Sequence, residues 1–195
     1  MTTYDPRTAL IVVDIQNDFA DSGGSLYVPG GEDVIDPVNR EIARASSEGA
    51  LVVHTQDWHP ESTPHFEKDG GIWPVHCVAG RWGADFHPGL TLGGPTIRKG
   101  VGREDGYSGF STRDSETGES SSTGLAEMLE ERSIERVVVV GLALDYCVKA
   151  TALDARARGL ATQVLRSATR SVDLESGDGD RAIEEMRAAG IEILD

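Results

Sequence analysis

The run Ala-Leu-Ile-Val-Val at residues 9–13, closed at once by Asp14, is the stretch that decides the fold. Its five apolar residues are consecutive, whereas a strand with one solvated face would alternate apolar and polar residues. A continuous run of this kind is typical of a strand covered on both faces, as in a parallel sheet. Val137–Val140, which ends at Gly141, repeats the pattern. Both runs therefore predict buried strands of a parallel sheet.

Shorter apolar runs and helical periodicities alternate along the rest of the chain. Further strands are predicted at Leu51–Val53, Pro95–Arg98, Thr162–Leu165 and Ile191–Leu194. Helices are predicted at Val34–Ala45, Gly124–Arg132, Asp145–Arg158 and Asp180–Ala189. This alternation predicts a doubly wound α/β fold, in which a mostly parallel sheet carries helices on both faces in a three-layer sandwich. The pattern does not set the order of the strands.

Two stretches do not follow the alternation. Residues 57–94 hold four of the five His and all three Trp, and residues 102–123 are rich in Ser, Gly, Asp and Glu. Long loops in compact domains are usually functional or disordered. We expect the first stretch to be a binding loop, and the second to be a loop whose Ser-rich end, residues 111–123, is mobile.

The composition excludes several classes of partner. The chain of 195 residues has 33 Asp and Glu against 18 Lys and Arg, for a net charge of −15. Nucleic acid and anionic membranes need a basic face, so neither is expected as a partner. Two cysteines cannot form a disulfide framework, and the N-terminus lacks the pattern of a secretory signal. We expect one soluble, cytoplasmic domain over residues 1–195, with the oligomeric state, homo-oligomers included, left open.

Candidate catalytic residues follow the predicted strands, where open α/β sheets bind their ligands. Asp14 follows the first strand, Lys99 follows residues 95–98, and Cys147 lies near the start of the helix predicted from Asp145. The N-terminus of a helix favours a thiolate, and its N–H groups can hold an oxyanion. Cys147 is therefore the candidate nucleophile, with Asp14 as proton carrier and Lys99 as a positive charge. The alternative is that Cys147 is a small core residue.

Asp57, His59, His65 and His76 fall within twenty residues of one another beside a strand end. The Asp-x-His spacing places two side chains on the same side of an extended segment, and a loop can return the other two. Three imidazoles and one carboxylate suit zinc, iron or manganese better than calcium or magnesium. We predict one divalent metal ion here, zinc first, with iron and manganese as alternatives. The other interpretation is a set of scattered surface or hydrogen-bonding histidines.

Several aromatic residues are expected near the same edge of the sheet. Phe19 follows the first strand, Trp58 follows Asp57, and Tyr107 joins them if its loop folds over. Trp73 stands three residues before His76, so we interpret it as a wall of a pocket for a flat ligand. The alternative for each is an ordinary core position.

Five short motifs in these segments resemble those of nicotinamidases and pyrazinamidases, in the superfamily of isochorismatase-like cysteine hydrolases. They are Asp-Ile-Gln-Asn-Asp-Phe at 14–19, Thr-Gln-Asp-Trp-His-Pro at 55–60, Trp-Pro-Val-His-Cys-Val at 73–78, Gly-Ala-Asp-Phe-His-Pro at 83–88 and Asp-Tyr-Cys-Val at 145–148. The resemblance runs from about Thr8 to Ser167, in the order and approximate spacing of the family. One such motif alone is weak evidence for the family, whereas all five in this order are specific to it.

The resemblance implies an isochorismatase-like fold and the hydrolysis of nicotinamide to nicotinate and ammonia through a thioester, a step of NAD salvage. It implies a catalytic triad of Asp14, Lys99 and Cys147. It also implies that the divalent metal is held by Asp57, His59, His65 and His76.

The resemblance further implies the contacts of the substrate. Phe19, Trp73 and Tyr107 would border the pyridine ring. The backbone N–H groups of Ala143 and Cys147 would form the oxyanion hole, beside a cis peptide between Leu142 and Ala143.

Two positions depart from the family pattern, and both are expected to alter the rim of the pocket. Leu144 stands where Thr is common, and Arg81-Trp82 replaces a Thr-containing link. Neither removes a predicted catalytic group. The sequence does not decide whether pyrazinamide and other ring-substituted amides are accepted.

Three other functions would share some of these sequence features. A carbamoylsarcosine amidase-like hydrolase of amides or ureido compounds would share the triad but generally lack the metal cluster. A non-catalytic binding protein on the same fold would lack a member of the triad, and none is missing. A metal-storing or redox-sensing protein would use Cys77 and Cys147, which do not form a recognisable resolving pair.

Overall fold

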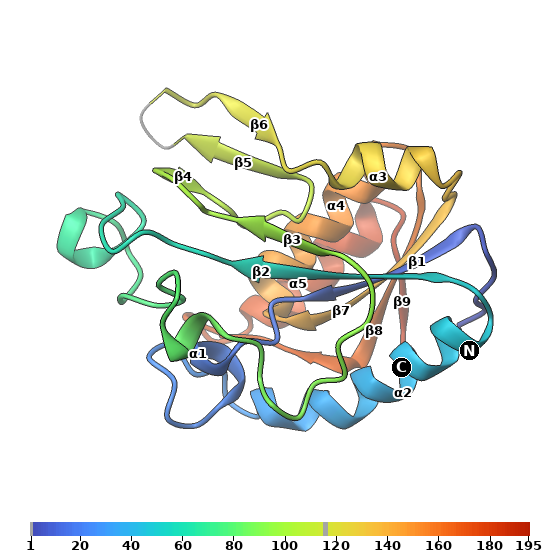
Figure 1. Cartoon of the computed structure of the whole chain (residues 1–195), viewed down its shortest axis with the longest axis horizontal. Coiled ribbons are helices and arrows are strands. Elements are labelled where there is room, and N and C mark those ends of the chain that lie inside the picture. The colour runs from blue at the N-terminus through green and yellow to red at the C-terminus, as the bar shows by residue number, and fades with distance from the viewer. Residues whose placement is uncertain (1, 115–116) are drawn as a thin grey trace.

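The computed structural model describes residues 2–114 and 117–195. Its centre is a six-stranded sheet in the order β3-β2-β1-β7-β8-β9, in which every pair of neighbours is parallel (Figure 1). The strands are β1 (Thr8–Val13), β2 (Leu51–Asp57), β3 (Thr96–Lys99), β7 (Arg136–Leu142), β8 (Ala161–Arg170) and β9 (Glu192–Leu194). The predicted α/β class with a mostly parallel sheet is confirmed.

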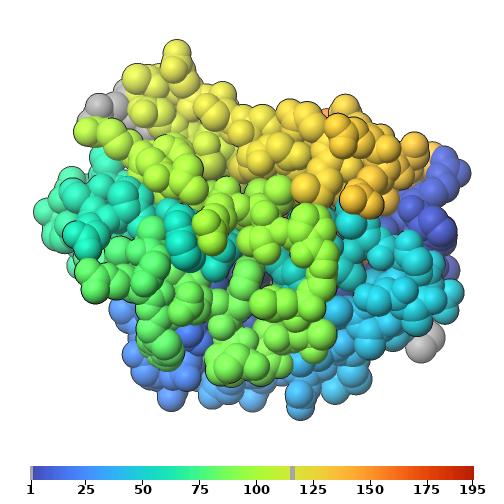
Figure 2. All heavy atoms as spheres, viewed as in Figure 1, coloured from blue at the N-terminus to red at the C-terminus, as the bar shows by residue number. Residues whose placement is uncertain are grey.

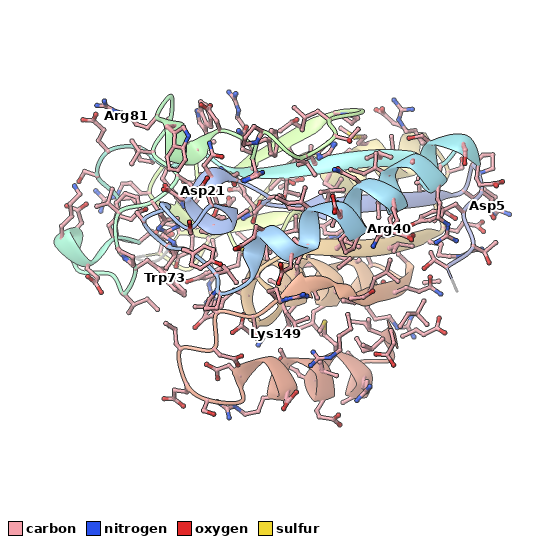
Figure 3. All side chains as sticks on the ribbon, turned by 90° about the horizontal axis from the view of Figure 1, so that it is seen from below. Asp5, Asp21, Arg40, Trp73, Arg81 and Lys149 are labelled. Atoms are coloured by element: carbon pink, nitrogen blue, oxygen red, sulfur yellow. The ribbon has the colours of Figure 1, made fainter. Side chains whose placement is uncertain are left out.

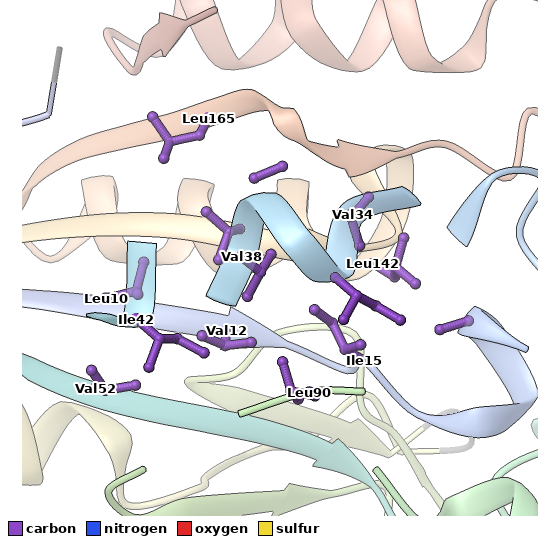
Figure 4. Packing of buried hydrophobic residues seen from close by; sticks show 14 of the residues in the cluster. Leu10, Val12, Ile15, Val34, Val38, Ile42, Val52, Leu90, Leu142 and Leu165 are labelled. Atoms are coloured by element: carbon purple, nitrogen blue, oxygen red, sulfur yellow. The ribbon is translucent and has the colours of Figure 1, made fainter. Parts of the chain in front are cut away.

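Helices cover both faces of this sheet. The helix α2 (Ile35–Ser47) packs on one face, where its apolar residues, spaced three or four apart, meet the strands (Figure 4). The helices α3 (Leu125–Glu131), α4 (Lys149–Ala157) and α5 (Asp178–Ala188) contribute to the core on the other face. Shorter turns are α1 (Asn17–Ala20), η1 (Gly31–Val34), η2 (Glu67–Asp69) and η3 (Trp82–Ala84). The predicted three layers are therefore present.

The burial of β1 explains its uninterrupted apolar run. Leu10 and Val12 belong to the core beneath α2, whereas Ala9, Ile11 and Val13 belong to the core beneath α3, α4 and α5. All five are at most 1% exposed. Burial of each larger side chain contributes about 1.5–3 kcal/mol. A polar residue at any of these positions would face one of the two cores.

Two strands reach further than the sequence pattern predicts. β2 extends to Asp57 and β3 ends at Lys99, and these two residues are partners in the sheet register. The polar end of β2 is buried like its apolar beginning, so apolar runs alone understate its length. Both charged side chains are consequently fixed by regular sheet structure.

The predicted helix from Asp145 to Arg158 is divided. Leu144–Val148 (η4) forms a π-helical turn, and α4 begins only at Lys149. The wider turn follows directly on β7, where the chain leaves the sheet. Cys147 therefore lies within a π-helical turn and not in the first turn of an α-helix, which corrects the prediction.

The prediction of a loop over residues 102–123 is wrong for much of that stretch. The segments β4 (Glu104–Asp105), β5 (Ser111–Asp114) and β6 (Ser120–Ser122) form a small antiparallel sheet (Figure 1). These strands are short and polar, so they carry no apolar pattern. Residues 115–116 of the expected mobile segment lie outside the described residues.

The chain crosses the sheet at β1, which lies between β2 and β7. After β1, the chain forms β2 and β3 on one side of β1. It then crosses to the other side of β1, where β7, β8 and β9 complete the sheet. Residues 58–86 and 100–110 gather at the carboxyl ends of these strands and cover that part of the molecule, whereas residues 89–95 run back to the amino end of β3 (Figures 1 and 2). Within residues 2–114 and 117–195, no helix is long and apolar enough to cross a membrane.

Candidate active site

Four of the predicted site residues have their side chains at the carboxyl ends of four strands. Asp14 directly follows β1, Asp57 ends β2, Lys99 ends β3, and Cys147 lies in the turn after β7. All four are buried. The order of the strands, which the sequence did not predict, brings them together at the crossing point of the sheet, where α/β folds bind ligands.

Lys99 contacts each of the other three residues of this cluster. Its Nζ lies 2.7 Å from Asp14 Oδ2, forms a second ion pair with Asp57 Oδ1, donates to the carbonyl of Gly106 and lies 3.5 Å from Cys147 Sγ. Burial alone would lower the pKa of Lys99, but the two carboxylates raise it well above its ordinary value. The ammonium therefore stays protonated and compensates the buried negative charges.

Asp14 is placed to exchange protons. Its backbone adopts a left-handed conformation with φ 47°, which turns the chain sharply at the end of β1. Its Oδ1 accepts a hydrogen bond of 2.6 Å from Thr55 Oγ1. Burial raises the pKa of Asp14 to about 6, against the opposing effect of Lys99. A carboxyl group with a pKa near the working pH is suited to general acid–base catalysis.

Cys147 is not the preformed thiolate that a helix N-terminus would favour. Burial raises the pKa of its thiol well above the ordinary value, and Lys99 only partly opposes this. The predicted lowering of its pKa is therefore wrong. A thiol in this environment needs a proton acceptor during attack, and Asp14 lies in the same cluster, with ligand atoms of Asp14, Asp57 and Cys147 within 4.8 Å of one another.

Three histidines form a second cluster beside the first. Candidate ligand atoms of His59, His65 and His76 all lie within 4.8 Å of one another. The rings of His59 and His65 stack with their centroids 4.9 Å apart. The ring of His59 also lies against Gly100, where a Cβ atom would come within 2.4 Å of it. The alternative of scattered surface histidines is therefore wrong for these three.

Hydrogen bonds fix the same tautomer in each ring. The Nδ1 atom of His59 lies 3.0 Å from the carbonyl of Gly100, and that of His76 lies 2.8 Å from the carbonyl of Pro74. The Nδ1 atom of His65 lies 2.6 Å from Asp105 Oδ1. Carbonyls and carboxylates only accept, so each Nδ1 carries a proton, and in the neutral ring the free lone pair is on Nε2.

These lone pairs fit a divalent metal ion. His59 Nε2 is buried without a hydrogen-bond partner, which is costly unless a ligand occupies the site. Burial lowers the pKa of His76 to about 4, so its ring is neutral and able to coordinate near pH 7. Asp57 Oδ2 lies 3.8 Å from His59 Nε2, while Asp57 Oδ1 pairs with Lys99. Asp57 thus faces both clusters.

A single pocket connects the two clusters. Its wall includes Cys147, Ala143, Asp57 and the three histidines, together with the predicted aromatic residues Phe19, Trp73 and Tyr107. Trp73 Nε1 donates a hydrogen bond of 2.8 Å to the hydroxyl of Tyr107. Figure 3 shows Trp73 at the end of the molecule opposite Asp5. The peptide bond between Leu142 and Ala143 is cis.

Part of the pocket wall was not predicted from the sequence. The residues missed are Leu26, Val28, Gly106, Tyr146 and Val172. Tyr146 meets Trp73 edge to face, with ring centroids 4.8 Å apart, and lies 5.8 Å from the ring of Tyr107. Its position directly before the candidate nucleophile was the one feature of the sequence that could have placed it in the pocket wall. Val172 lies far along the chain from every motif.

Side chains around the site hold its backbone in place. Gln16 donates to the carbonyl of Asp57 at 2.8 Å and accepts from the N–H of Asp57 at 2.8 Å. Asp18 accepts from the N–H groups of Cys77 and Ser25 at 2.7 and 3.0 Å. Cys77 itself is buried and free, and its pKa is raised by burial.

Comparisons with known proteins agree along almost the whole chain. The model of the isochorismatase domain matches residues 8–195. The nicotinamidase/pyrazinamidase of Mycobacterium tuberculosis is 41% identical over 190 residues, which cover 95% of this chain and 97% of the relative.

Solved structures give the same result. A pyrazinamidase of Pyrococcus horikoshii in complex with zinc has a TM-score of 0.85 and 41% identity, covering 97% of this chain and 99% of its own. A protein of L. infantum in complex with nicotinate has a TM-score of 0.88 and 39% identity, covering 99% of this chain and 95% of its own. The sequence motifs, the fold and these matches agree: the chain belongs to the isochorismatase family.

Proposed function

We propose that the chain is a nicotinamidase, which hydrolyses the carboxamide of nicotinamide to nicotinate and ammonia, a step of NAD salvage. The observation that carries the proposal is that Cys147 and the three-histidine cluster line the same pocket. Behind Cys147, Lys99 contacts both its sulfur atom and the carboxylate of Asp14. Relatives named nicotinamidase and pyrazinamidase match nearly the whole length of the chain. A binding protein without catalysis would have no need of a buried Asp–Lys–Cys cluster.

The metal ion of this site is zinc in our proposal, held by His59, His65 and His76 through Nε2 and by Asp57. Imidazole nitrogen and carboxylate oxygen are the ligands that zinc prefers, and the Pyrococcus horikoshii pyrazinamidase is a complex with zinc. When bound, the ion supplies a Lewis-acidic position for the ring nitrogen of a pyridine carboxamide. The histidines are arranged for that role by their Nδ1 hydrogen bonds.

The pocket suits a small, flat, uncharged ring. Phe19, Trp73 and Tyr107 would border the ring, with Tyr146 closing the wall beside Trp73. Aromatic walls bind flat rings by burial and by edge and face contacts. A neutral amide is neither attracted nor repelled by the net negative charge of the protein. Pyrazinamide, a ring of the same shape, is the second substrate to test, in line with the relative named nicotinamidase/pyrazinamidase.

Acylation starts from the neutral thiol. Asp14 accepts the proton of Cys147 as Sγ attacks the carboxamide carbon, while Lys99 balances the negative charge nearby. The backbone N–H groups of Ala143 and Cys147 hold the oxyanion. Asp14 then gives its proton to the amide nitrogen, the C–N bond breaks, and ammonia leaves. The nicotinoyl group remains on Sγ as a thioester.

Deacylation returns the residues to their starting state. Asp14, again a carboxylate, takes a proton from water as the water oxygen attacks the thioester carbon. The C–S bond breaks, Asp14 returns the proton to Cys147 Sγ, and the product leaves as nicotinic acid, which ionises to nicotinate in water. General acid–base catalysis contributes about 10²–10⁴-fold to such reactions. Loss of one oxyanion-hole donor costs about 10²–10³-fold in rate.

Release of ammonia from nicotinamide tests the proposal. The zinc-loaded protein should turn over, and Cys147→Ala should lose at least about 10³-fold in rate. Cys77→Ala is the matched control, because Cys77 is the other buried cysteine and lies outside the pocket wall. Loss of activity in Cys77→Ala but not in Cys147→Ala would reverse the assignment. A zinc-loaded protein without turnover of nicotinamide would refute the proposed function.

A further inference from the structure

The three histidines of the metal cluster differ in what holds them. His59 and His76 donate from Nδ1 to the backbone carbonyls of Gly100 and Pro74. His65 donates to a side chain, Oδ1 of Asp105, at 2.6 Å. A carboxylate acceptor makes a shorter and stronger hydrogen bond than a neutral carbonyl. His65 is therefore the one of the three whose Nδ1 proton is accepted by a carboxylate.

Asp105 is carried to His65 by the small antiparallel sheet. It ends β4 and pairs with Arg113 of β5 in the sheet register. The start of β5 is in turn tied to α4, because the hydroxyls of Ser108 and Ser111 donate to Asp154 Oδ2 at 2.7 and 2.8 Å. The segment expected to be a loop thus fixes a carboxylate 40 residues away from its partner.

We propose that Asp105 is a positioning residue of the metal site. Its carboxylate keeps His65 as the Nδ1–H tautomer, directs Nε2 toward the other two histidines, and makes that nitrogen a better donor to the metal. The inference deepens the proposed function, since it rests on the metal site described there. The small sheet then has a specific role, which is to hold one side of that site in place.

Zinc affinity measures this role directly. Competition with a chromophoric chelator should show about 10–100-fold weaker zinc binding in Asp105→Ala than in the wild type. Asp105→Asn should fall between the two, since its amide oxygen still accepts the Nδ1 proton but carries no charge. Glu104→Ala is the matched control on the same strand, because Glu104 accepts a local bond from the N–H of Gly102 at 3.2 Å and is not among the residues that line the pocket. It should bind zinc like the wild type.

Imidazole nitrogen NMR of the metal-free protein separates positioning from a general loss of structure. His65 should appear as the Nδ1–H tautomer in the wild type and in Asp105→Asn, and as a mixture with the Nε2–H tautomer in Asp105→Ala. Denaturant unfolding should show that the metal-free variants are folded. A wild-type His65 in the Nε2–H form would overturn the inference even if Asp105→Ala did not fold.

The outcomes also distinguish the two proposals. Equal zinc affinity in the wild type and Asp105→Ala would overturn the role of Asp105 and leave the proposed function intact. A wild type that binds no zinc would overturn both the role of Asp105 and the zinc site. An equal loss of affinity in Glu104→Ala and Asp105→Ala would show that the strand matters as a whole, and would also overturn the specific role.

Discussion

Asp57 and Lys99 are neighbours in the register of β2 and β3, and their side chains form a buried ion pair at the edge of the sheet. The other oxygen of Asp57 faces His59 Nε2 at 3.8 Å. The pair therefore joins the cluster that contains the nucleophile to the cluster that fits a metal. Removal of Lys99 would leave the buried carboxylates of Asp57 and Asp14 without a cation, whereas removal of Asp57 would leave Lys99 paired with Asp14 alone.

Lys99→Met should be both inactive and strongly destabilised. The substitution leaves Asp14 and Asp57 buried without a cation, and breaking a buried pair in this way costs about 3–5 kcal/mol. Lys149→Met is the matched control, because the ion pair of Lys149 with Glu185 is partly exposed and is worth less than about 1 kcal/mol. Denaturant unfolding and ammonia release measure both effects. Equal destabilisation of the two variants would contradict this account of Lys99.

The rate should fall in acid because Asp14 must be ionised to accept the thiol proton. Burial raises the pKa of Asp14 to about 6, so the carboxyl is protonated below that pH and cannot act as a base. We expect kcat/KM for nicotinamide to drop about tenfold for each pH unit below about 6. The measurement should use a tightly zinc-loaded protein, with zinc content checked at each pH. A profile that stays flat down to pH 4.5 would contradict the assignment of Asp14 as the base.

Tyr146 should control which rings enter the pocket. Its ring stands edge to face against Trp73 at 4.8 Å and is close to Tyr107, so Tyr146→Ala opens the wall. We expect the KM of Tyr146→Ala for nicotinamide to be about tenfold higher than that of the wild type. The ratio of kcat/KM for a ring-substituted amide to kcat/KM for nicotinamide should rise in the same variant. Tyr146→Phe keeps the ring and should resemble the wild type. Steady-state kinetics on nicotinamide and a methylated analogue provide the test, and unchanged selectivity in Tyr146→Ala would refute this role.

The sequence predicted the parts of the molecule that depend on local pattern. The β1 run required burial on both faces, and Asp14 and Lys99 followed from the rule that sites lie where strands end. Asp105 could not be predicted, because its function depends on a contact with His65 that the folded chain creates. The sheet that carries it is built from short polar strands, which leave no periodic signal. The protonation state of Cys147 depends on burial, which the motif around it does not encode.

The close approach of Asp18 to Gly83 gives a last prediction, on stability. A Cβ atom at Gly83 would lie 2.0 Å from the Asp18 carboxylate, which cannot move freely because it accepts from the N–H groups of Cys77 and Ser25. Gly83→Ala should therefore cost about 1–3 kcal/mol of unfolding free energy. Gly93→Ala is the matched control, since nothing lies within 4 Å of its Cβ position. Because Asp18 also holds the segment that carries His76, zinc affinity should fall in Gly83→Ala and stay unchanged in Gly93→Ala. Wild-type stability in Gly83→Ala would mean that Asp18 is free to turn away, and its hydrogen bonds would then not be what holds this segment beside the metal cluster.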